Sequence, residues 1–110
     1  MSDKAIYQRF GVKPEYPLPG TKMGIALGTI SRRPINGLRH NPESGTNGWF
    51  VWGGEEMSDA DDFFSPLHLE HISDYLPQVQ DLLALPPGYR FLIDDNGYED
   101  VWLDTDLLSK

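Results

Sequence analysis

The stretch Tyr89-Arg-Phe-Leu-Ile-Asp-Asp-Asn-Gly-Tyr-Glu-Asp-Val-Trp-Leu-Asp104 carries the clearest structural signal in the sequence. Two runs rich in aromatic and aliphatic residues, 89–94 and 98–104, flank Asn96-Gly97, the pair preferred in two-residue type I′ turns. The stretch therefore predicts a β-hairpin. With Asn96 and Gly97 as its loop, three cross-strand pairs follow: Asp95 with Tyr98, Leu92 with Val101 and Phe91 with Trp102. Both faces of this hairpin are largely apolar, which predicts a central position in a sheet.

Two further strands and one helix are expected upstream of the hairpin. Residues 22–31 alternate larger residues with small ones, and residues 49–52 form the aromatic run Trp-Phe-Val-Trp. Residues 67–75 are expected to be extended or to form one helical turn. Apolar residues at spacings of three and four predict a helix from about Pro77 to Ala84, because proline is tolerated in a first helical turn.

The remaining segments are rich in proline and glycine. Residues 31–48 contain two prolines, three asparagines and three glycines, which predicts a long loop. Residues 1–20 are expected to form an extended, proline-rich N-terminal arm. The predicted fold class is α+β: a small antiparallel β-sheet of about four strands, one main helix packed on it, and the arm. Residues 21–110 are expected to form a single domain.

Composition excludes several classes of protein. The 110-residue chain has no cysteine, which excludes disulfides and thiolate metal sites. It has no apolar run near 18 residues, and residues 1–10 lack the apolar core of a secretory signal. These features predict a cytoplasmic protein.

Charge is distributed unevenly along the chain. Residues 1–42 contain seven bases and two acids, whereas residues 43–110 contain two bases and fifteen acids. Two acidic clusters stand out: Glu55, Glu56, Asp59, Asp61 and Asp62, and then Asp94, Asp95, Glu99, Asp100, Asp104 and Asp106. Acidic surfaces repel nucleic acids and anionic lipids and attract basic proteins, so we expect neither a nucleic-acid nor a membrane partner. The simplest interpretation of either cluster is a solvated surface that keeps the domain soluble.

No pattern typical of catalysis, of a metal or of a cofactor is present. His68 and His71 could share a helix face, but a metal site needs a third ligand and a rigid frame. Residues 94–100 resemble a calcium loop, yet Gly97 is not at the position that an EF-hand requires. The paired carboxylates lie among polar residues and glycines, where nothing would raise their pKa values. We therefore expect a non-enzymatic protein without a metal or cofactor.

The aromatic run beside the first acidic cluster has two interpretations. Packing in the core explains the run most simply. Alternatively, Trp52 anchors a partner protein, because tryptophan surrounded by charge is common at interfaces. The predicted partner-binding residues are Trp52, Glu55, Glu56, Asp59, Asp61 and Asp62.

The segment Gly48-Trp-Phe-Val-Trp-Gly-Gly-Glu-Glu56 is similar to the Gly-Trp-x-x-x-x-Gly-x-Glu block of the Imm33 family, also known as the DUF2185 domain. The order of the other segments resembles that family as well. A strand ending at Ser31-Arg32 precedes the block, and a Leu/Ile-rich segment with a proline, the sequence 87–91 and the hairpin segment 98–102 follow it. The resemblance covers residues 22–104 and leaves out the N-terminal arm.

The resemblance implies a bacterial immunity protein of a polymorphic toxin system, which binds a cognate protein toxin and offers no established catalytic residues. A toxin that acts on nucleic acids has a basic cleft, and the run 55–62 would fit such a cleft, with Trp52 as an apolar anchor. Two alternatives stay open: a small regulatory or interaction module with another partner, and a ligand-binding protein or enzyme. The sequence gives no indication of the oligomeric state.

Overall fold

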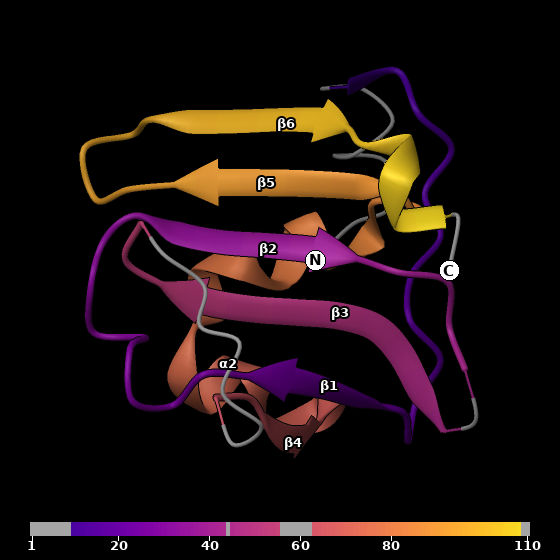
Figure 1. The fold of residues 1–110 in the computed structure, drawn as a ribbon, viewed down its shortest axis with the longest axis horizontal. Helices are drawn as coiled ribbons and strands as arrows, with labels where there is room; N and C mark the ends of the chain where they lie inside the picture. Colours follow the sequence, from indigo (N-terminus) through magenta and orange to yellow (C-terminus); the bar gives the residue numbers. More distant parts are fainter. Residues whose placement is uncertain (1–9, 44, 56–62, 109–110) are drawn as a thin grey trace.

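The computed structural model describes residues 10–43, 45–55 and 63–108 and shows an α+β fold built on one mixed sheet (Figure 1). The strands, in chain order, are β1 Lys22–Ile25, β2 Ile35–Arg39, β3 Thr46–Gly53, β4 Ser65–His68, β5 Tyr89–Ile93 and β6 Glu99–Leu103. The helical segments are η1 Leu69–His71, α2 Ile72–Tyr75, η2 Pro77–Ala84 and η3 Thr105–Leu108. The strand order is β4-β1-β3-β2-β5-β6, with β1 parallel to β3 and the other neighbouring pairs antiparallel.

The sheet has six strands rather than about four, because the predicted loop 31–48 contains the central strand β2 and residues 65–68 form the edge strand β4. All five residues of β2 are buried although two of them are polar and one is a glycine. Asn36 donates from Nδ2 to the carbonyl oxygen of Gly54 at 2.6 Å. Gly37 lies opposite Phe91, whose ring occupies the place that a Cβ would take. Each polar residue of β2 thus has its own hydrogen-bond partner elsewhere in the fold. A pattern of hydrophobic residues in the sequence does not indicate such a strand.

The helical part is divided into more and tighter segments than predicted. Residues 67–75 do form the end of β4 and one short helical turn, as expected. The predicted helix 77–84 has the expected bounds but is a 3₁₀ helix. Leu76 separates it from α2 with φ −140° and ψ 69°, because a residue that precedes proline is pushed out of the helical region. In the described part of the chain, no helix is long and apolar enough to cross a membrane.

The predicted hairpin is present, but its register differs by one residue and it lies at the edge of the sheet. Phe91 pairs with Val101, and Leu92 pairs with Asp100. Four of the five residues of β6 are exposed. The central strands are instead β3 and β2, which explains why both faces of the aromatic run in β3 are buried or half-buried.

Asp94 accounts for the register of the hairpin. Its Oδ1 accepts hydrogen bonds from the amides of Asn96 at 2.8 Å and Tyr98 at 3.0 Å. The Asp94 amide in turn donates to the Tyr98 carbonyl, which leaves a loop of three residues. Only Gly97 in this loop has a positive φ, of 87°. A type I′ turn needs positive φ at both central residues, and Asn96 does not adopt it.

The two faces of the sheet carry separate apolar clusters. On the face that the helical segments cover, Trp49, Val51 and Phe91 pack with side chains of η1, α2 and η2. The Trp49 indole nitrogen donates to the Leu83 carbonyl at 3.0 Å, which joins β3 to η2. The cluster on the opposite face is smaller and consists of Ala26, Leu38, Trp52 and Leu107 with Phe50, Phe63 and Phe64 against it.

Arg39 connects three segments inside the protein. Only 2% of its surface is exposed. Its guanidinium donates to the carbonyl oxygens of Glu15 at 2.6 Å, Leu85 at 2.8 Å and Asn47 at 2.9 Å. The arm, the end of η2 and the start of β3 therefore meet at one cation. Burial lowers the pKa of Arg39, an effect that the Glu15 carboxylate partly opposes.

Glu70 holds the end of the arm and makes this contact sensitive to acid. The Gly20 amide donates to Glu70 Oε2 at 2.8 Å, and this bond lowers the pKa of Glu70. A lowered carboxyl pKa means that the contact contributes at neutral pH and is lost as the pH falls through the pKa of the folded state, which lies below the usual glutamate value. We expect the Gly20 amide proton to titrate in NMR spectra with a midpoint below the usual value for glutamate. In Glu70→Gln this transition disappears; a normal midpoint in the unchanged protein would contradict the assignment.

Candidate functional site

One end of the sheet brings together charged segments that are distant in sequence (Figure 1). Ile35 at the start of β2 lies opposite Gly53 at the end of β3 and Ile93 at the end of β5, and Ile93 lies opposite Glu99. The loop before β2, the segment after β3 and the β5–β6 turn therefore share this end. We call it the hairpin end and define it by Arg33, Glu55, Asp94, Asp95, Tyr98 and Glu99.

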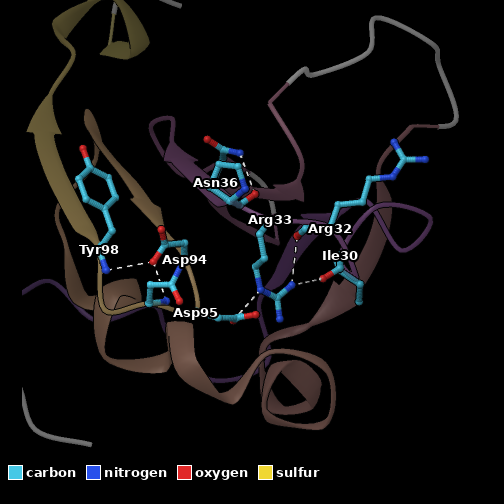
Figure 2. A network of polar contacts seen from close by, with 9 residues as sticks. Ile30, Arg32, Arg33, Asn36, Asp94, Asp95 and Tyr98 are labelled. Carbon is cyan, nitrogen blue, oxygen red and sulfur yellow. Dashed lines mark hydrogen bonds and ion pairs between the residues drawn. The ribbon is translucent and has the colours of Figure 1, made fainter.

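An arginine fixes two of these segments to each other, as Figure 2 shows. Arg33 Nε donates to Asp95 Oδ1 at 2.8 Å, and its Nη1 donates to the carbonyls of Ile30 and Arg32. Both side chains are solvated, with 33% and 70% of their surfaces exposed. Such a pair contributes little to the free energy of unfolding, so its main effect is to hold the loop before β2 against the hairpin turn.

A shallow cleft of about 570 Å³ opens beside this ion pair. Its lining residues are Arg33, Pro34, Leu92, Asp94, Asp95, Asn96 and Tyr98. The Tyr98 ring extends away from the turn that holds its backbone, and 53% of the residue is exposed. The cleft thus combines an aromatic ring, carboxylates and one paired arginine.

The second exposed aromatic residue of the hairpin, Trp102, is held in a fixed arrangement. Arg90 lies opposite it on β5, with its guanidinium carbon 5.7 Å from the ring centroid. Arg90 Nη1 also forms a 3.1 Å ion pair with Asp104 Oδ2. Cation–π contact and ion pair together orient the indole, and 37% of Trp102 stays exposed. A rigid, half-exposed indole among acids has the properties of an interface anchor.

A family comparison covers nearly the whole chain. The model of the Imm33-like domain matches residues 2–104. The chain belongs to the Imm33-like family. No curated protein and no solved structure matches it.

The glycines and the tryptophan of the Imm33-like block have structural roles here. Gly48 and Gly54 both have positive φ, of 86° and 89°. A Cβ on Gly48 would overlap the carbonyl oxygen of His40. Trp49 is completely buried, and the amide of Gly54 donates to the Pro34 carbonyl. The block therefore builds β3 and its exit toward the hairpin end of this Imm33-like domain.

The predicted binding residues fall into three groups in the structure. Trp52 is buried, with 3% of its surface exposed, and its ring lies 6.2 Å from that of Phe64. Glu55 is exposed at the hairpin end. Glu56, Asp59, Asp61 and Asp62 lie outside the described residues. At the hairpin, the exposed aromatic residues beside acids are Tyr98 and Trp102, for which the sequence predicted a place in the hairpin but no binding role. The signal available for them was the presence of two aromatic residues among three acids over 98–104.

The two central tryptophans of the Imm33-like domain allow a matched comparison. Trp49 Nε1 donates to Leu83, whereas Trp52 Nε1 is buried without a partner among the described residues. We expect Trp49→Phe to lower the free energy of unfolding by about 1–3 kcal/mol more than Trp52→Phe, because only the first substitution leaves a buried carbonyl unsatisfied. Urea denaturation of both variants measures the difference. Equal losses would show that the Trp49 hydrogen bond contributes nothing.

The histidines of the domain occupy separate environments. The rings of His68 and His71 lie 6.1 Å apart, and Glu70 between them binds the Gly20 amide. Among residues 10–43, 45–55 and 63–108, no three histidine, cysteine or acidic side chains lie close enough to hold a metal ion. His40 lines a hollow of about 300 Å³ near Phe50, with Nδ1 3.2 Å from the Leu107 carbonyl. This ring is packed edge-on against Phe50 and serves to close the smaller apolar cluster.

Proposed function

We propose that this Imm33-like domain is a bacterial immunity protein that binds a cognate protein toxin through the hairpin end and the adjacent β6 strand. The observation that carries the proposal is the pair of exposed aromatic residues, Tyr98 and Trp102, among the acids of the hairpin in a member of this family. Aromatic anchors surrounded by charge are typical of high-affinity protein interfaces.

The proposed surface has two acidic parts. The hairpin contributes Asp95, Glu99 and Asp100, and the end of β3 contributes Glu55. The run that follows Glu55 in the sequence adds four further acids, Glu56, Asp59, Asp61 and Asp62. A basic toxin is attracted by this field and associates quickly. Trp52 supports the site by filling the interior under the end of β3.

In this proposal, the protein neutralises its toxin by binding to it in the cytoplasm of the producing cell. It catalyses no reaction and holds no cofactor. The hydrogen bonds of Asp94 in the β5–β6 turn and the contact of Arg90 with Trp102 support such a role, because a preorganised surface loses little conformational entropy on binding.

The decisive experiment is co-purification of the tagged full chain from the cells that produce it. One stoichiometric partner that is encoded beside this protein, and that is toxic when expressed alone, supports the proposal. Recovery of a housekeeping complex, or a partner without toxicity, would contradict it and favour a regulatory module.

Binding kinetics with that toxin test which residues form the surface. We expect Tyr98→Ala with Trp102→Ala to weaken binding by about 100-fold or more through faster dissociation, because hot-spot aromatics each contribute about 2 kcal/mol.

Charge reversal of Asp59, Asp61 and Asp62 is expected to slow association about tenfold and to flatten its salt dependence. Tyr75→Ala is the matched control, because Tyr75 is 46% exposed on α2, outside the hairpin end. An unchanged association rate would remove the run 59–62 from the interface.

A further inference from the structure

β6 offers an array of outward-facing backbone groups. It is the last strand of the sheet and pairs with β5 alone among the described strands. The Asp94 amide donates to the Tyr98 carbonyl, and the Asp104 amide donates to the Gly88 carbonyl. In an antiparallel pair, successive residues alternate between bonding to the neighbour and facing away from it. Even-numbered residues of β6 therefore bond to β5, and Val101 and Leu103 direct their N–H and C=O groups away from the sheet.

The two edges of the sheet differ in how well they are protected. The opposite edge, β4, has four residues, and one of them is Pro66, which has no amide hydrogen. β6 has five residues, contains no proline and pairs with β5 without a bulge. Its protection consists of charge, from Glu99 and Asp100. The acidic charge of this edge repels an acidic strand that would pair with β6 and attracts a basic one.

We propose that β6 accepts an additional strand from its partner, and that this strand is an extended segment with lysine or arginine at alternate positions. Main-chain hydrogen bonds to residues 101 and 103 supply affinity in this mode of recognition. The basic side chains on one face of the added strand lie beside Asp100 and the half-exposed Trp102. A second copy of this chain is the less suitable occupant, since it would place two acidic hairpins together. The inference rests on the proposed function and specifies the segment that the toxin contributes.

The test uses a synthetic probe and the full chain. The probe is a capped nine-residue peptide of alternating lysine and valine. In the control peptide, glutamate replaces each lysine. We expect the lysine peptide to slow amide hydrogen exchange at residues 101 and 103 by about fivefold or more, with residues 100 and 102 unchanged. Protection by both peptides alike, or by neither, overturns the inference. Concentration-dependent dimers that protect the same amides without peptide identify a second copy as the occupant and also overturn it.

Val101→Pro removes one outward amide and leaves the bonds to β5 in place. We expect this variant to bind the lysine peptide about tenfold more weakly. Leu103→Pro is the second variant, used if the first one does not fold, because Leu103 is 52% exposed and its amide also faces outward. Asp100→Lys tests the charge alone and is expected to weaken binding about threefold. Undiminished binding by a folded proline variant contradicts strand addition. Because the peptide assay needs no toxin, its outcome is separate from that of the immunity proposal.

Discussion

Replacing Arg39 by alanine is expected to lower the free energy of unfolding by about 3–5 kcal/mol. The substitution removes all three hydrogen bonds of the guanidinium and leaves the carbonyls of Glu15, Leu85 and Asn47 without these partners inside the protein. It also removes a cation 5.8 Å from the Trp49 ring centroid. Relief of the desolvated charge offsets only part of this loss, because the carbonyls of Leu85 and Asn47 remain buried.

The measurement is urea denaturation combined with limited proteolysis of the arm. Arg39→Lys serves as the control that keeps the charge. An ammonium group on a shorter stem does not reproduce the forked geometry, so we expect the lysine variant to lose about half as much stability. Faster cleavage within residues 11–20 should accompany both losses. A change below about 1 kcal/mol in the alanine variant would mean that solvent replaces these bonds at no cost.

Gly48→Ala is expected to cost about 3 kcal/mol or more, through two effects that add. The positive φ of 86° is strained for any residue with a Cβ, and that Cβ would overlap the backbone oxygen of His40. His40 cannot move aside easily, because its amide donates to the Gly48 carbonyl at 2.8 Å. The start of β3 would therefore have to separate from the end of β2.

Gly45→Ala is the matched control for this substitution. Gly45 has a similar φ of 77°, but a Cβ there has open space around it. Its expected cost is the conformational strain alone, about 1 kcal/mol. Thermal and chemical denaturation of the two variants then separate strain from overlap. Equal stabilities would show that the chain near His40 adjusts without loss.

The hairpin was predictable from sequence because its signals are local, whereas β2 was not. Alternation and Asn96-Gly97 place two strands and a turn correctly. The one-residue error in register arose because Asp94, a side chain outside the expected loop, binds the backbone of the turn. β2 owes its position to distant partners, such as Gly54 for Asn36 and Phe91 for Gly37. Such partners cannot be read from the residues 31–48 themselves.

The residues of the Imm33-like block that stand out in the sequence are not the ones that form the proposed binding surface. Gly48, Trp49 and Gly54 are prominent in the sequence, and in the structure they satisfy backbone and packing needs. The surface that we propose for toxin binding uses Tyr98 and Trp102 instead. Their exposure follows from the edge position of β6, which depends on the order of all six strands.

The three tryptophans also give the protein an intrinsic optical reporter. Trp49 and Trp52 are buried on opposite faces of the sheet, whereas Trp102 alone contacts water substantially. Indole emission shifts to shorter wavelength when water leaves the ring, so occupation of β6 alters one fluorophore while the other two stay constant. Emission recorded on the long-wavelength side of the band, where a solvated indole contributes most, would follow complex formation without any attached dye.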